Sequence, residues 1–296
     1  MIHKYLRAVG FSHVTNRQQI QELISDAVKD ATIRKIVRRQ DAYAFGMFQK
    51  DYAPGIGIAV CGEYDDNDTF LFDYYFPYLK SDGISTAEDI SLERLAAQEA
   101  YTGIVDEARV GVSLIFFMRN LTDYMERGRE KDHALHGATL TLSALSDGGT
   151  IMLPIMKSRK DQDMTRKKSV KRYKMIAAAK RGNESAIESL TLEDMDTYTA
   201  VSKKIRESDV FTLVDTYFMP YGVECDHYSV LGEIRTCRRV LNSMTGESVY
   251  ILKLLCNDMY FDVCINAADL VGEPLSGRRF KGNIWMQGQV NFTDRA

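Results

Sequence analysis

Residues 215–221 have the sequence DTYFMPY, and a near copy, DYYFPY, occupies residues 73–78. Each copy follows an apolar pair, Leu213-Val214 in one case and Leu71-Phe72 in the other, and precedes a polar turn. Proline cannot donate to a β-ladder and is confined to edges, strand starts and bulges. We therefore expect both copies to end a β-strand, with their aromatic side chains packed in the core.

The repetition predicts an α+β protein built from two β-rich antiparallel modules joined by a basic helical connector. The boundaries fall at residues 1–160 for an N-terminal α+β module, 161–208 for the connector and 209–296 for an all-β module. Five short strands in the last module indicate a barrel or a curved sheet. A duplication and a chance recurrence of strand-ending residues both remain open, and different strand orders in the two halves would contradict the duplication.

Periodicity and turn residues locate the individual elements. In the first half we expect a helix over about 15–30 with a short continuation at 33–39, strands at 43–48, 56–64, 69–76 and 110–118, and a hairpin of 139–145 and 150–156. The hairpin rests on the reversal signal Ser146-Asp147-Gly148-Gly149. Residues 90–101 fit either strand or helix. Later strands are expected at 210–218, 228–238, 249–256, 260–266 and 280–292.

The composition is that of a globular protein, with 45% apolar and 27% charged residues in 296. No run of 18 apolar residues is present, so we expect no membrane span. The N-terminal residues show no signal-peptide pattern, and the five cysteines form no CxxC pair. These features predict a cytoplasmic location with reduced thiols.

One segment differs sharply in charge from the rest of the chain. Residues 157–181 hold 11 of the 38 Lys and Arg residues but only two of the 41 acids. Such a segment is typical of a site for an anionic partner, but it could equally fold against the acidic surface of the same protein. The candidate anion-binding residues within it are Arg166, Lys167, Lys168, Lys171 and Arg172.

Two short constellations carry groups that could act chemically. Cys225, Asp226 and His227 follow the second motif copy directly, but strand neighbours point to opposite faces, which favours a polar turn over a catalytic pair. His133 and His136 have the spacing of metal ligands, but no companion cluster is visible, which favours loop histidines. We therefore expect no metal, no cofactor and no catalytic residue that the sequence alone identifies.

The stretch Gly277–Gly288 combines three cations with the only tryptophan of the chain. Basic residues interleaved with aromatics can bind nucleic acid through phosphate contacts and base stacking. A core strand with a basic edge explains the same pattern and is favoured, because aromatic side chains most often report packing. Candidate ligand-binding residues from this stretch and from the second motif region are Tyr221, Asp226, His227, Arg278, Arg279, Lys281 and Trp285.

Four stretches together resemble a family of uncharacterised bacterial proteins that is known only as a domain of unknown function. They are residues 3–11, Arg109–Phe117, Met219–Glu224 and Gly277–Gly288, and the resemblance covers nearly the whole chain. It implies a bacterial, cytoplasmic protein and supplies no activity, cofactor or site residues.

The leading functional hypothesis is a non-enzymatic binding or scaffold protein with a protein partner or an anionic ligand. A first alternative is a nucleic-acid or anionic-ligand binder that uses residues 157–181 and the strand at 278–285. A second alternative is an enzyme whose site forms only in the fold, around Tyr221, Asp226 and His227. The sequence leaves the oligomeric state undecided.

Overall fold

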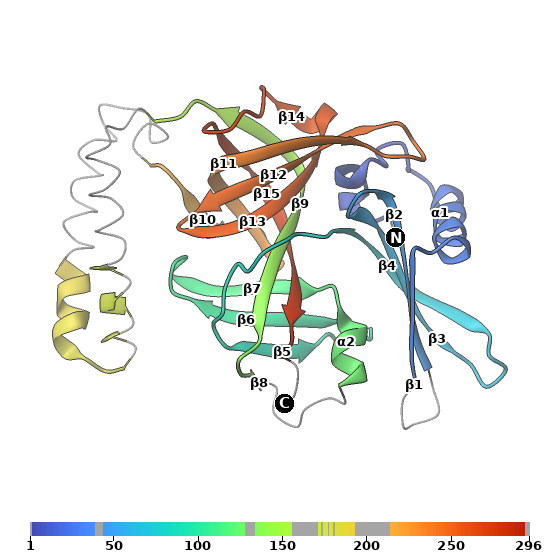
Figure 1. The fold of residues 1–296 in the computed structure, drawn as a ribbon, viewed down its shortest axis with the longest axis horizontal. Helices are drawn as coiled ribbons and strands as arrows, with labels where there is room; N and C mark the ends of the chain where they lie inside the picture. Colours follow the sequence, from blue (N-terminus) through green and yellow to red (C-terminus); the bar gives the residue numbers. More distant parts are fainter. Residues whose placement is uncertain are drawn as a thin grey trace.

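The computed structural model describes residues 2–38, 44–96, 98–127, 134–155, 171–192 without 173, 177 and 180, and 214–293. These residues form one sheet of four strands and one of eleven (Figure 1). β-Strands therefore dominate, as expected from the sequence. Over these ranges, none of the helices has the length and apolar character needed to cross a membrane.

The N-terminal part consists of two helical segments and the four-stranded sheet. They are the 3₁₀ helix η1 (Lys4–Val9), the helix α1 (Arg17–Lys29), and the strands β1 (Ile33–Arg38), β2 (Ala44–Ala53), β3 (Ile56–Tyr64) and β4 (Phe70–Leu79). Asn16 caps α1 in a capping box with Gln19. The helical continuation expected at 33–39 is wrong: three β-branched residues favour a strand there, and β1 pairs with β2.

The two motif copies lie on edge strands of different sheets. β4 continues through Pro77, which is paired with Ile58, to Leu79. β10 (Tyr217–Pro220) ends at its proline, opposite Tyr228. The strand-ending prediction is therefore confirmed for the second copy and wrong for the first. Pro77 lacks an N–H group, but β4 is an edge strand, and its outer side has no neighbouring strand that would need that donor.

The eleven-stranded sheet closes on itself to form a five-stranded barrel. Its staves are β9 (Thr139–Met152), β11 (His227–Leu241), β12 (Ser248–Cys256), β13 (Met259–Asn266) and β15 (Arg279–Asn291). Closure follows because β15 pairs with β9 on one side and with β11 on the other. The expected barrel-like C-terminal architecture is therefore confirmed, with one stave, β9, taken from residues 1–160.

The remaining strands extend this sheet. They are β5 (Ile90–Arg94), β6 (Tyr101–Glu107), β7 (Val112–Met118), β8 (Ala134–Leu135) and β14 (Leu270–Val271), with the short helical segments α2 (Leu121–Glu126) and η2 (Ala267–Asp269). Residues 90–94 thus form a strand, and the strand expected at 110–118 is present as β7. The helix α2 was not expected from the sequence.

The hairpin expected within 139–156 is wrong, because β9 is one continuous strand (Figure 1). The ladder between β9 and β15 is irregular near Asp147 and Gly148, so the Asp-Gly pair is absorbed there rather than reversing the chain. Gly149 lies opposite Gly282, and the ring of Phe280 occupies the space that a Cβ atom on either glycine would need. These glycines serve packing in the barrel and not a turn.

The duplication is not confirmed, because the two motif copies have different connections. β4 pairs with the strand before it, β3, whereas β10 pairs with the strand after it, β11. Most of the connector lies outside the described residues, including Arg166, Lys167 and Lys168. The described residues 171–172, 174–176, 178–179 and 184–192 are helical, and Gly182 lies between these pieces at φ 82°, in the left-handed region common for a glycine at a helix C-terminus.

Candidate functional site

The outer face of three neighbouring staves, β9, β15 and β11, carries four of the seven candidate ligand-binding residues, namely His227, Arg279, Lys281 and Trp285. Residues directly opposite each other in an antiparallel ladder share a face. On this face Lys281 lies between Thr150 and Leu231, Asn283 lies opposite Ser229, and Trp285 lies opposite His227. The alternate positions Phe280, Ile284 and Val230 are fully buried inside the barrel.

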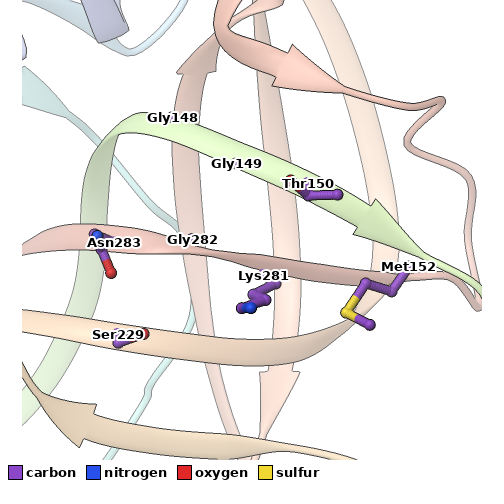
Figure 2. A pocket seen from close by; sticks show the side chains of 8 residues that line it. All are labelled: Gly148, Gly149, Thr150, Met152, Ser229, Lys281, Gly282 and Asn283. Carbon is purple, nitrogen blue, oxygen red and sulfur yellow. The ribbon is translucent and has the colours of Figure 1, made fainter. Parts of the chain in front are cut away.

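A hollow of about 380 Å³ lies on this face. Its lining residues are Gly148, Gly149, Thr150, Met152, Ser229, Lys281, Gly282 and Asn283. Figure 2 shows that they come from the three adjacent strands. They provide one ammonium group, two hydroxyls, one carboxamide and glycine backbone, and the volume is in the range of small-molecule sites.

At one end of this face, Arg279 is buried and donates hydrogen bonds to two backbone carbonyls. Its Nε donates to the Leu153 carbonyl at 3.1 Å, and Nη1 donates to the Val214 carbonyl at 2.8 Å. Burial lowers the pKa of Arg279. Leu153 lies just past the end of β9 and Val214 lies before β10, so this guanidinium holds both of these segments against β15.

At the other end, the Asp226 carboxylate accepts two hydrogen bonds. His227 Nδ1 lies 2.9 Å from Asp226 Oδ1, and Trp285 Nε1 donates to Asp226 Oδ2 at 2.7 Å. Asp226 precedes β11, so the alternation of strand side chains does not keep it away from His227. A carboxylate on Nδ1 fixes the neutral imidazole with its Nδ1 protonated and its Nε2 as an acceptor.

The 3₁₀ helix η1 and its N-cap His3 cover this end. The Tyr5 ring is stacked on Trp285 at 5.6 Å, and its centroid lies 5.6 Å from that of His227. The His3 ring lies 4.8 Å from Trp285, and the His3 amide donates to the Tyr75 hydroxyl at 2.9 Å. Trp285 is only 5% exposed, so its ring cannot offer a free face to a nucleic-acid base.

Burial shapes the protonation of this cluster. The pKa of His3 is lowered to about 4, mainly by burial and to a smaller extent by the nearby His227. Burial also raises the pKa of the Tyr5 hydroxyl, with Asp147, Asp226 and Glu224 adding to the shift. Both side chains are therefore neutral at pH 7, and the Tyr5 hydroxyl has no hydrogen-bond partner among the described residues.

The remaining sequence-based candidates lie apart from this face or face solvent. Arg278 donates to the Glu273 carbonyl at 2.8 Å, and Tyr221 is about half exposed. Lys171 and Arg172 belong to the helical residues of the connector, and His133 lies outside the described residues. His136 pairs with Asp89 at 3.1 Å, and the described part of the chain holds no group of three metal-ligating side chains.

The structure thus brings together Asp226, His227, Lys281 and Trp285 from the sequence-based set. It adds five residues that the sequence did not single out: His3, Tyr5, Thr150, Ser229 and Asn283. Ser229 and Asn283 could have been found from alternation with His227 and Trp285, which places them on the same face. His3 and Tyr5 carry no such signal, because they lie more than 200 residues away in the sequence.

A family model matches residues 6–288, which is nearly the whole chain. The description of that family is "Domain of unknown function, E. rectale Gene description (DUF3881)". No curated protein and no solved structure matches the chain. The resemblance to an uncharacterised family is therefore confirmed, and it assigns no function and no site residues.

Proposed function

Since the chain belongs to the family DUF3881, which has no assigned function, we propose from its own geometry that it is a non-enzymatic binding protein for a small anionic ligand. The binding site is the hollow between β9, β15 and β11. The observation that carries the proposal is the convergence of one ammonium and several neutral hydrogen-bonding groups on a hollow of about 380 Å³.

The lining chemistry favours an anion over a cation or an apolar ligand. Lys281 supplies a positive charge, while Asn283, Ser229 and Thr150 can each donate a hydrogen bond. The eight described lining residues include no Asp or Glu. Lys281 already has an interaction of its own, so a bound anion would share or exchange that partner.

Binding is favoured over catalysis by the way His227 is used. Its Nδ1 is bonded to Asp226 and its ring lies against Tyr5. The hydroxyl nearest along the strand, that of Ser229, lies 3.4 Å from the Tyr217 hydroxyl instead. A nucleophile needs a base within hydrogen-bond reach, and the described residues place no hydroxyl or thiol on His227 in this way.

Gly148 provides a direct test of the hollow. A Cβ atom built there meets nothing within 4 Å, so a side chain can enter the open space without a clash. We expect isothermal titration to detect binding of at least one of inorganic phosphate, pyrophosphate and citrate. Gly148→Leu should abolish that binding while the melting temperature stays unchanged, and Gly148→Ala should weaken it only slightly.

Failure of all three anions to bind, or undiminished binding by Gly148→Leu, would contradict the proposal.

A second pair of variants tests the role of the positive charge on Lys281. Lys281→Gln should lower the affinity about tenfold or more, because a hydrogen bond to a charged group is worth about 1.5–3 kcal/mol. The matched control is Lys29→Gln, on the exposed C-terminal turn of α1, which should bind like the unmodified protein.

A further inference from the structure

The Tyr5 hydroxyl is one of five buried side-chain atoms that have no hydrogen-bond partner among the described residues, and the only tyrosine hydroxyl among them. Tyr5 is 1% exposed, and its oxygen has no hydrogen-bond partner among the described residues. The other large buried tyrosines are paired: Tyr78 donates to Asp51 and Tyr228 to the Ile115 carbonyl. Because buried hydroxyls normally have partners, an unpaired one points to a group that the protein meets from outside the chain.

A complementary group lies beside it. In the tautomer that the Asp226 contact favours, His227 Nε2 can act as an acceptor; its side chain is 13% exposed, and its ring is 5.6 Å from the Tyr5 ring. His227 and Trp285 form the next rung of the ladder after Ser229 and Asn283, which line the hollow. Successive rungs on one face are about 7 Å apart, so a compound in the hollow can extend to His227.

At the corner between the hollow and Tyr5, an exposed contact of Lys4 links Tyr5 to the residue beside the hollow. Lys4 Nζ lies 4.7 Å over the Tyr5 ring and 3.1 Å from the carboxylate of Asp147, the neighbour of Gly148. The Lys4 and Asp147 side chains are 54% and 33% exposed. Ion pairs this exposed contribute little to stability, so an entering ligand can displace Lys4 at small cost.

A hydroxyl group is the ligand chemistry that satisfies both sides of this corner. Its oxygen accepts from the Tyr5 hydroxyl, and its hydrogen is donated to His227 Nε2. We infer that the ligand is a small anionic compound that also carries a hydroxyl, of the size of a sugar phosphate, with the anion at Lys281 and the hydroxyl between Tyr5 and His227. This inference rests on the function proposed above and adds the class of ligand.

Titration of the full chain with inorganic phosphate, glucose and glucose 6-phosphate tests the inference. We expect glucose 6-phosphate to bind about tenfold or more tightly than phosphate, since it adds one hydrogen-bonded group. Tyr5→Phe should remove that advantage and leave the affinity for phosphate unchanged. The same variant should melt at the same or a higher temperature, because the hydroxyl that it loses has no partner in the free protein.

The matched control is Tyr52→Phe, since Tyr52 is as buried as Tyr5 but donates to Asp26 at 2.7 Å. It should lower the melting temperature and leave both affinities unchanged. Equal affinity for phosphate and glucose 6-phosphate, or a Tyr5→Phe variant that is destabilised and binds normally, would overturn the inference and leave the anion site standing. The second of these results would mean that an ordered water satisfies Tyr5. Absence of binding by phosphate, pyrophosphate, citrate and glucose 6-phosphate would instead overturn the proposed function itself.

Discussion

The two ends of the outer β9–β15–β11 face treat their polar groups differently. At one end Arg279 donates to the carbonyls of Leu153, just past β9, and Val214, before β10. At the other end Asp226 accepts from two donors, while the buried Tyr5 hydroxyl is left without a partner among the described residues. An end whose buried polar groups have hydrogen-bond partners, here called the saturated end, is explained by folding alone. An end with an unpaired buried polar group, the unsaturated end, suggests binding. The following predictions test this contrast.

The largest effect is expected from Trp285→Ala at the unsaturated end. The ring is 5% exposed and packs against His3, Tyr5 and Phe117. Loss of a buried aromatic of this size costs about 3–5 kcal/mol in free energy of unfolding. Urea denaturation followed by circular dichroism measures it, and a loss below about 1 kcal/mol would show that η1 does not depend on this ring.

Acid should weaken the same end through His3. Its Nδ1 accepts from the Tyr5 amide at 3.4 Å, and its pKa is about 4 in the folded protein against 6.5 for a free histidine. The unfolded chain therefore binds the proton more readily, so stability is fully present above pH 6.5 and falls as the pH drops towards 4. The shift corresponds to about 3 kcal/mol at most.

The comparison with His3→Asn isolates this contribution. Asparagine retains an oxygen that can cap η1 and does not titrate. Chemical denaturation between pH 7 and 4 should therefore show a smaller loss for the variant than for the unmodified protein. Carboxylates with lowered pKa values, such as Glu107 and Glu247, weaken both proteins alike in this range. Parallel pH curves for the two proteins would contradict the role given to His3.

At the saturated end, Arg279→Met should lower the free energy of unfolding by about 2 kcal/mol. Methionine fills much of the same volume but leaves the Leu153 and Val214 carbonyls without their donor, and an unsatisfied buried group costs about 1–3 kcal/mol. Anion binding measured by titration should persist, because Lys281 is unchanged. A variant that loses binding before it loses stability would place Arg279 in the site and end the contrast.

The same contrast shows what the sequence could and could not predict. Residue types identified Asp226, His227, Lys281 and Trp285, and alternation located the staves β11, β12, β13 and β15 closely. The sequence analysis named Arg279 and Trp285 as ligand-binding candidates, yet both are buried. The local pattern of a strand does not show which distant residues pack over it. The β9 hairpin failed for a similar reason: the Asp-Gly signal is local, whereas Phe280, which packs against Gly149, lies 131 residues away.

The smallest effect should come from Asp226→Asn, which sharpens the account of the unsaturated end. The carboxylate accepts from Trp285 Nε1 and His227 Nδ1, and an amide offers one oxygen and one donating nitrogen instead. If the amide oxygen still accepts from Trp285 Nε1, the amide nitrogen faces His227 Nδ1. His227 Nδ1 must then accept a hydrogen bond from it. His227 would carry its proton on Nε2, which is the nitrogen that we assign to the ligand hydroxyl. Because Asp226 is 21% exposed at its side chain, we expect a loss of only about 1 kcal/mol in the free energy of unfolding.

Nitrogen-15 NMR of the imidazole should show the tautomer change, and the affinity for glucose 6-phosphate should fall to that for phosphate. An unchanged tautomer together with unchanged affinity would mean that Asp226 positions Trp285 alone.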